Sequence, residues 1–541
     1  MENMNIANII FSVISLSVCI AVFVQALQTG SPNELSSKKY RLLLGLIIFF
    51  ALFIRLWKFG TVPGGINQDG AMAGVDAKAL YEYGTDRFGM RYPVHFTAWG
   101  FGQMSVLMSY MMIPFIKLIS LNAISLRLPT LISSLMGLAA LFLLSRDAYG
   151  RKSSLFILFI AAVNPWHIMQ SRWALDCNLL PHFFIAGIYL LYKSLNGKIW
   201  YLVVSMLCFG LCMYCYGISI YTVTLFLLIA FIWLLSSKRI SLKRSFTALA
   251  VYLIIAWPFI TCMVINAFGL DTIETALFTI PYFPGTIRSG DILFFSDDIP
   301  QQLISNLSCT FKLIFQNYTD SLSNMILGFG TMYIFSVPFM IIGFFYTLTS
   351  CKKNPVSVLV IILFYVGIID GAITKNVNAN RINIIFYPLI IFCGLGLSFC
   401  AERIRYAALP CLIMFFSAFC IFSYTYFTSY ADSIYKVFLG DFGQALSSIK
   451  DSNYNRVYIT PDSQYEGSGH VSRILELYYH DIDAKYYQSD EYSEKYKYIR
   501  VKPGDISNES IYIVTENELE GFDPNEFEIR QYGRFYTAVP K

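Results

Sequence analysis

The sequence has little charge for its length. Only 14% of its 541 residues are Asp, Glu, Lys or Arg, whereas 56% are hydrophobic and the mean hydropathy is +0.54. A soluble globular protein has about 25% charged residues. No basic run is long enough to follow a phosphate backbone, and the net charge is only +5. These shortages exclude a soluble enzyme, a disordered chain and a nucleic-acid-binding protein.

The cysteines do not form the pattern of a disulfide-stabilised domain. Most of the twelve lie in apolar runs, and residues 430–541 contain none. In such runs cysteine behaves as a small hydrophobic residue. Cys208, Cys212 and Cys215 share one helix face, but no histidine or carboxylate accompanies them. Packing therefore explains them better than a metal site.

The apolar residues gather in runs of about 20, the length that a helix needs to cross the hydrocarbon core of a bilayer. The sequence therefore predicts an all-α polytopic membrane protein of about twelve transmembrane helices. The predicted spans are 6–28, 40–59, 125–145, 153–170, 178–194, 199–216, 218–235, 246–266, 324–347, 355–373, 382–400 and 406–428.

Basic residues follow every second span, for example at 38–41, 151–152 and 238–239. Loops of this kind face the cytoplasm. The N-terminus, the long loops 60–124 and 267–323 and the tail are then extracytoplasmic, as in a plasma-membrane protein. Residues 103–119 are apolar, but a crossing there would reverse the charge pattern, so we expect a helix in the outer interface.

The chain changes character near residue 431. Residues 1–430 form the predicted membrane domain, and residues 431–541 are polar. Alternating segments predict strands at 456–460 and 511–515, a helix at 468–480 and a hairpin at 526–539. A small extracytoplasmic α/β domain follows from this pattern.

The densest group of ionisable residues lies in the first long loop. Asp69 follows a span directly and stands among three glycines, which let the backbone turn sharply and approach a ligand. Asp76 and His95 follow, together with Glu82, Asp86, Arg87 and Arg91. The alternative for all of these charges, and above all for Asp86, Arg87 and Arg91, is a solvated loop surface.

Two further groups lie at the predicted outer ends of spans. Arg172 and Asp176 stand between two spans, where an ionisable group needs a partner or a role; the alternative is an i, i+4 ion pair between them. His167 and His182 are near the bilayer edge, where helix-end hydrogen bonds could explain them. Arg381 precedes an apolar run and could hold a phosphate, or simply extend to the interface. The second long loop carries Arg288, Asp291, Asp297 and Asp298 and resembles a cover over the site.

The order of these features resembles a known family. An external Asp after an early span is followed by Arg127-Leu128-Pro129, then by Gly150-Arg151-Lys152, then by NPWHIMQSRWALD at residues 164–176. This order is similar to that of bacterial GT-C glycosyltransferases, in the branch that contains protein O-mannosyltransferases and lipid A aminoarabinose transferase. The resemblance is good over about residues 40–200, weaker over 200–430 and absent from the tail.

The resemblance implies transfer of a sugar from a polyprenyl-phosphate or polyprenyl-diphosphate carrier to an acceptor outside the membrane. It implies Asp69 as the general base. Substrate-binding residues are then Arg127, Arg172, Asp176, Arg381, Asp76 and His95, with Lys375 as a further cation for the phosphate. Some relatives use a divalent cation, which Asp69 and Asp176 could ligate. Two departures from the family are Gly70, where relatives often have a second acid, and Gln103, where many have a lysine.

Three other functions fit a polytopic chain. A flippase keeps charged residues deep in its bundle and shows pseudo-repeats, whereas these charges gather at one face. A lipid-linked glycan polymerase or ligase shares the donor, but the early Asp loop favours a transferase. A receptor with a sensing tail leaves the charges of the first loop unexplained.

The predicted orientation is directly testable. In a cysteine-accessibility scan, probes placed in 60–100, 267–323 and the tail should react with an impermeant reagent added from outside. Labelling of the tail from the cytoplasmic side alone would contradict the orientation and, with it, an external site.

Overall fold

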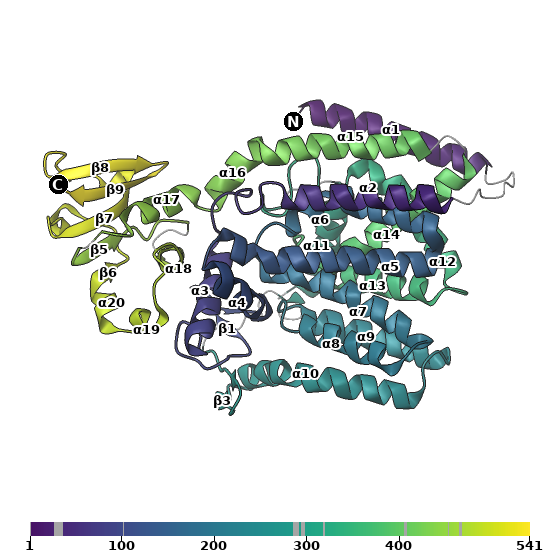
Figure 1. The fold of residues 1–541 in the computed structure, drawn as a ribbon, viewed down its shortest axis with the longest axis horizontal. Coiled ribbons are helices and arrows are strands. Elements are labelled where there is room, and N and C mark those ends of the chain that lie inside the picture. Colours follow the sequence, from purple (N-terminus) through teal and green to yellow (C-terminus); the bar gives the residue numbers. More distant parts are fainter. Residues whose placement is uncertain are drawn as a thin grey trace.

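The structure is a computed structural model, and it describes residues 2–25, 36–100, 102–284, 292–293, 298–316, 320–404, 408–452, 454–464 and 468–541. It is mostly helical. Figure 1 shows long helices side by side in a bundle, with a small sheet beyond one end and α3 between the two. That end of the bundle is called the loop end below.

The helices of the bundle follow the predicted apolar runs. They are α1 (Glu2–Gln25), α2 (Ser37–Leu56), α5 (Ala123–Val163), α7 (Leu180–Leu195), α8 (Ile199–Cys212), α9 (Ser219–Ser236), α10 (Leu242–Phe268), α12 (Val337–Ser350), α13 (Pro355–Ile373), α14 (Phe386–Arg403) and α15 (Ala408–Phe427). Helices dominate because a backbone in hydrocarbon must satisfy its own hydrogen bonds.

Among the described residues, six helices are long and apolar enough to cross a membrane: α5, α9, α10, α13, residues 383–403 and α15. Shorter apolar helices include residues 7–20, 199–212 and 334–350. The chain is therefore a multi-pass membrane protein. The total of about twelve spans stays a prediction.

Helix α5 covers two predicted spans. Gly150 interrupts it with φ +85° and ψ 174°, a conformation outside the helical region. Arg127 near its start bonds the carbonyl of Gly65, and Ala162 near its end accepts from Arg55 of α2. Both ends of α5 therefore lie at the loop end, and the chain reverses at Gly150.

The predicted span at 324–347 is wrong in its first part. The helix begins only at η4 (Ile334–Ser336), which leads into α12. Gly328 and Gly330 adopt φ +91° and +69°, which no right-handed helix accommodates. The segment is apolar, and Met325, Ile326, Phe329 and Met332 are buried although Leu327 is exposed, so its composition was similar to that of a span.

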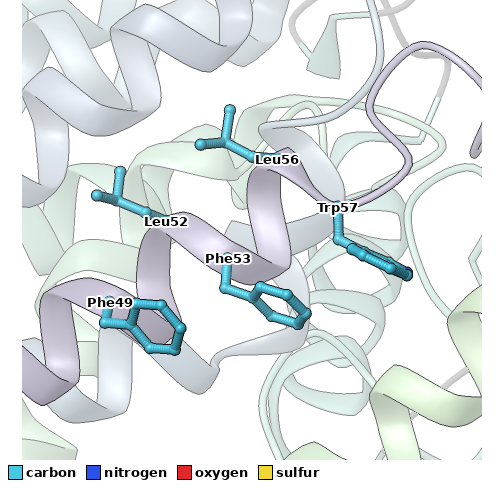
Figure 2. Close-up of a pocket in the computed structure, with 5 residues that line it drawn as sticks. All are labelled: Phe49, Leu52, Phe53, Leu56 and Trp57. Atoms are coloured by element: carbon cyan, nitrogen blue, oxygen red, sulfur yellow. The ribbon is translucent and has the colours of Figure 1, made fainter.

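One face of α2 shows how the bundle meets the bilayer. Figure 2 shows Phe49, Leu52, Phe53, Leu56 and Trp57 along this face, where they line a shallow apolar pocket. Successive rings of Phe49, Phe53 and Trp57 stack with centroids 6.1 and 5.4 Å apart. An exposed apolar face that ends in a tryptophan is typical of a surface in contact with lipid.

Short elements fill the loop end. They are α3 (Gln68–Tyr83), β1 (Phe96–Thr97), β2 (Gln103–Met104), α4 (Leu107–Ile119), α6 (Pro165–Gln170), η1 (Asp176–Leu179), β3 (Ile273–Glu274), β4 (Thr279–Ile280), α11 (Ile299–Phe315) and η5 (Asn383–Ile385). Helix α4 has 13 residues, about 20 Å of helix, against about 30 Å of hydrocarbon. That residues 103–119 lie in the outer interface without crossing stays a prediction.

The C-terminal part of the chain forms a five-stranded sheet in the order β6-β5-β7-β9-β8. Strand β5 is parallel to β6 and β7, whereas β9 is antiparallel to β7 and β8. The elements are α16 (Ser429–Val437), α17 (Gly440–Ile449), β5 (Arg456–Ile459), α18 (His470–Tyr479), α19 (Ala484–Tyr487), α20 (Asp490–Lys495), β6 (Tyr496–Lys497), η6 (Pro503–Asp505), β7 (Ser510–Thr515), η7 (Glu516–Glu518), β8 (Phe527–Tyr532) and β9 (Phe535–Pro540). The predicted strands, helix and hairpin of the tail are all present.

A buried ion pair organises the first long loop. Asp76 on α3 is fully buried, and its carboxylate accepts the backbone N–H of Arg87 at 3.0 Å and the Arg87 guanidinium. The same guanidinium donates to the carbonyls of Thr97 (2.7 Å) and Ala98 (3.0 Å). Arg87 therefore joins α3 to β1 and to the residue that follows this strand.

We expect Arg87→Ala to destabilise the protein strongly, because it leaves the Asp76 carboxylate buried without a counter-ion. Breaking a buried pair in this way costs about 3–5 kcal/mol. The measurement is the thermal unfolding midpoint of the purified protein. Arg530→Ala is the matched control, since it removes an exposed ion pair with Glu528 and should leave the midpoint unchanged. Equal midpoints for Arg87→Ala and the wild type would contradict a structural role for the pair.

Candidate active site

Asp69 lies in the first turn of α3, where the helix dipole favours a negative charge. It is half-buried, and the indole N–H of Trp99 donates to its Oδ1 at 2.7 Å. The chain reaches α3 from α2 through the turn at 57–67, in which Gly65 has φ +74°. The glycine-rich turn predicted from the sequence thus presents Asp69 at the loop end.

The structure brings Asp69 close to the second predicted group. Burial raises the pKa of the Cys177 thiol well above its ordinary value, and the nearby carboxylates of Asp176 and Asp69 raise it further. Asp176 itself is buried and accepts the backbone N–H of Cys177 at 2.7 Å. Both carboxylates therefore lie near the Cys177 thiol, and Gly70 beside Asp69 packs against Ala174, two residues before Asp176.

The packing at Gly70 explains why no second acid follows Asp69. A Cβ at this position would lie 3.2 Å from the Ala174 carbonyl oxygen, 3.3 Å from Ala174 Cβ and 2.8 Å from Asn67 Oδ1. The segment that carries Asp176 therefore packs directly against the turn that carries Asp69. A larger side chain at residue 70 would push the two apart.

The guanidinium of Arg172 is hydrogen-bonded to backbone carbonyls. Its guanidinium is fully buried and donates to the carbonyls of Ile54, Arg55, Trp57, Lys58 and Val62 at 2.7–3.3 Å. These carbonyls belong to the last turn of α2 and the chain after it, which a helix end leaves without partners. None of the contacts of Arg172 in the described structure involves Asp176, so the alternative of an i, i+4 ion pair between them does not hold there.

A buried polar network, missed in the sequence, lies beside Arg172. Arg55 donates to His167 Nδ1 at 2.9 Å, His167 Nε2 contacts the Tyr387 hydroxyl at 3.1 Å, and that hydroxyl contacts His182 Nδ1 at 2.8 Å. Since Arg55 can only donate, His167 accepts at Nδ1 and donates from Nε2. Tyr387 then donates to His182. The two histidines are core groups that join α2, α6, α7 and α14.

The other predicted cations differ in accessibility. Arg127 is buried, and its Nη2 donates to the Gly65 carbonyl at 3.1 Å. Its Nη1 has no hydrogen-bond partner in the described part of the chain. Arg381 is half-buried, folds back onto the carbonyl of Lys375, and lies at the surface of the loop end. Of the four cations, Arg381 and Lys375 retain exposed surface.

Asp76, His95 and Gln103 each contact other side chains of the protein. Asp76 is paired with Arg87 and does not face solvent, contrary to the alternative of a solvated loop charge. The His95 ring packs edge-on against Phe259 and Phe283, with centroids 5.6 and 6.2 Å away. Gln103 bonds Asn266 Oδ1 at 3.5 Å. His95 and Gln103 thus join the first loop to α10 and to the chain after it.

Asp370 is a buried acid that the sequence reasoning did not single out. It lies on α13 near the loop end and is only 1% exposed; its Oδ2 accepts the Thr222 hydroxyl at 2.8 Å. Its position inside a predicted span was the signal that could have found it, as was also true of Arg55. In the second long loop, Asp298 caps α11, whereas Arg288, Asp291 and Asp297 lie outside the described residues.

The described residues do not assemble a ligand set for a cation. Within them, no group of three or more His, Cys, Asp or Glu could hold a metal ion. Asp69 and Asp176 supply two carboxylates, whereas Ca²⁺ takes about six to eight oxygen ligands. We therefore assign no step to a metal.

Arg172 and Arg381 should respond differently to truncation. Arg172→Ala strips five carbonyls of their donor, so we expect a lower thermal unfolding midpoint and less folded protein in the membrane. Arg172→Lys should recover little, because an ammonium lacks the planar fork of donors. Arg381→Ala, at the surface, should keep the wild-type midpoint. A wild-type midpoint for Arg172→Ala would contradict its role in holding the end of α2.

Comparisons with known proteins agree with the fold. Residues 104–265 match the family model described as dolichyl-phosphate-mannose-protein mannosyltransferase, a segment that includes Arg172 and Asp176 but not Asp69. No curated protein matches the chain in sequence. The structure is similar to that of ArnT from Cupriavidus metallidurans in the apo state, with a TM-score of 0.58 at 9% identity over 92% of this chain and 98% of that one.

The likeness extends to a second state of that protein. ArnT from Cupriavidus metallidurans bound to undecaprenyl phosphate matches with a TM-score of 0.56 at 11% identity, over 92% of this chain and 97% of that one. A weaker likeness, with a TM-score of 0.49 at 12% identity, covers 82% of this chain and 64% of the apo oligosaccharyltransferase of Archaeoglobus fulgidus. The chain has the fold of ArnT, and its predicted resemblance to GT-C glycosyltransferases is confirmed at the level of the fold.

Proposed function

We propose that this chain is a membrane glycosyltransferase that moves a sugar from a polyprenyl-phosphate or polyprenyl-diphosphate carrier to an extracytoplasmic acceptor. The acceptor class is a cell-envelope glycan, lipid or protein. The observation that carries the proposal is the position of Asp69. Its carboxylate lies at the first turn of α3, is oriented by Trp99 and shares its surroundings with Asp176, in a chain with the fold of ArnT.

The proposed reaction transfers one proton and exchanges one bond at the anomeric carbon of the sugar. The Asp69 carboxylate takes the proton of an acceptor hydroxyl as the hydroxyl oxygen attacks the anomeric carbon of the sugar. The bond between that carbon and the phosphate oxygen breaks, and the carrier leaves as its free phosphate or diphosphate. The carboxylate then releases the proton to solvent.

The carrier phosphate needs a cation at the loop end. Arg381, close to Lys375, retains exposed surface there, whereas the donors of Arg172 are occupied by carbonyls. We therefore assign the phosphate contact to Arg381 and Lys375. The likeness to an ArnT structure that holds undecaprenyl phosphate supports a carrier of this class.

Two other functions remain as alternatives. A lipid-linked glycan polymerase or ligase would use the same carrier, and a flippase would move it without chemistry. The assay separates them: a transferase releases free carrier in proportion to glycosylated acceptor, a polymerase extends a glycan, and a flippase releases nothing. Purified protein is incubated with a panel of polyprenyl-phosphate sugars, and the release of free carrier is followed.

We expect Asp69→Asn to fold and bind the carrier, while transfer falls by about 10²–10⁴-fold, the typical contribution of a general base. The amide keeps the size of the side chain but cannot take the proton. Transfer is measured as carrier release, and folding as the thermal unfolding midpoint.

The matched control is Glu82→Gln, on the same helix, exposed and 3.9 Å from Lys78. It neutralises an acid of α3 near the far end of the helix and should transfer at the wild-type rate. Transfer by Asp69→Asn within a few-fold of the wild type would remove Asp69 as the base, and Asp176 would become the candidate.

A further inference from the structure

The indole of Trp99 is hydrogen-bonded to the Asp69 carboxylate. The contact between its indole nitrogen and Asp69 Oδ1 is 2.7 Å, a short hydrogen bond to a charged acceptor. Trp99 and Asp69 are both half-buried, and they come from different elements, the loop after β1 and the first turn of α3. The geometry of the carboxylate therefore depends on where the loop after β1 lies.

One side of that loop is held by the first long loop itself. Arg87, paired with the buried Asp76, donates to the carbonyls of Thr97 and Ala98, immediately before Trp99. Strand β1 pairs with β2 across residues 96–104. The backbone on the N-terminal side of Trp99 is thus joined to α3, the helix that carries Asp69.

The other side is held by the C-terminal domain, here residues 429–541. His470, the first residue of α18, packs on Gly100: a Cβ at Gly100 would lie 2.7 Å from His470 Cβ and 2.8 Å from its Cγ. Gln488 of the same domain donates to the backbone carbonyl of Arg87 at 3.1 Å. The domain therefore touches both the residue after Trp99 and the arginine that anchors the strand before it.

The same domain lies along α3. Asp481 pairs with Lys78 at 2.7 Å, the hydroxyl of Tyr83 donates to Asp483, and Lys485 lies 4.3 Å over the Tyr83 ring. Figure 1 shows α18 next to α3, between the sheet and the bundle. Helix α3 and the Trp99 loop are therefore both in contact with the C-terminal domain.

From these contacts we infer that Trp99 is a positioning residue for Asp69, and that the C-terminal domain completes the active site by holding the Trp99 loop. The inference rests on the proposed role of Asp69 as the base. A base must be aligned within hydrogen-bond reach of the hydroxyl, and a misplacement of about 1 Å can cost about 100-fold in rate. A donor to a carboxylate also favours its charged form, the form that accepts the proton.

The first test is Trp99→Phe, which keeps an aromatic ring and removes the N–H. We expect kcat to fall by about 10-fold to 100-fold, with little change in the donor KM. The acidic limb of the pH profile of kcat/KM should move to higher pH, because the carboxylate loses a donor that favours its charged form. A merely structural role for Trp99 would not move the pH profile.

Trp257→Phe is the matched control, because this tryptophan is exposed on α10 and packs beside Phe278. It should keep the wild-type kcat and pH profile. Thermal unfolding midpoints establish that each variant is folded.

The second test addresses the C-terminal domain. Gly100→Ala places a methyl group against His470, so we expect the same direction of change in kcat and pH profile as for Trp99→Phe. The double variant Gly100→Ala/His470→Gly removes the clashing atoms and should recover most of the rate. Lack of recovery, or a wild-type rate for Gly100→Ala alone, would overturn the link through the domain.

The outcomes separate the inference from the proposed function. Wild-type transfer by Asp69→Asn would remove the base and the proposed mechanism together. A large loss in Asp69→Asn, with a wild-type kcat and pH profile for Trp99→Phe, would leave the base in place and overturn the positioning role alone.

Discussion

Two buried guanidinium groups hold the turn on which the candidate site depends. Arg55 and Arg172 are fully buried, and neither pairs with a carboxylate in the described structure. Arg55 binds carbonyls of α2 and α5, while Arg172 binds the carbonyls that end α2 and begin the turn toward Asp69. Removing a charge from water is costly, and here several carbonyl dipoles offset that cost. The position of Asp69 follows from this arrangement.

Helix α3 is a shared platform between the bundle and the C-terminal domain. One end carries Asp69, next to Gly70, which packs against Ala174, and its middle buries the Asp76–Arg87 pair. Its other residues meet the C-terminal domain through Lys78 and Tyr83. The C-terminal sheet thus has a physical connection to the candidate site, through α18 and the Trp99 loop.

Some roles of charged residues could be predicted from the sequence, and others could not. Arg172 stands at the predicted mouth of two spans, which favoured a phosphate contact, yet its partners are backbone carbonyls more than a hundred residues away. Backbone carbonyls have no signature in a sequence. His167 and His182 likewise became core groups, because Tyr387 reaches them from α14. Arg55 and Asp370, by contrast, stood inside predicted spans, where an ionisable side chain is itself a signal.

The sequence by itself determined the membrane class, most of the helices, the strands of the tail and the glycine-rich turn before Asp69, because these depend on local hydropathy, alternation and residue type. The break at Gly150 falls between the predicted spans 125–145 and 153–170, whereas the late start of α12 depended on Gly328 and Gly330, whose positive φ composition does not reveal. Only the tertiary structure brought Asp176, Trp99 and the C-terminal domain to Asp69. The reason is physical: proximity between distant segments depends on packing and on side-chain bonds to backbone, and neither leaves a periodic trace in the chain.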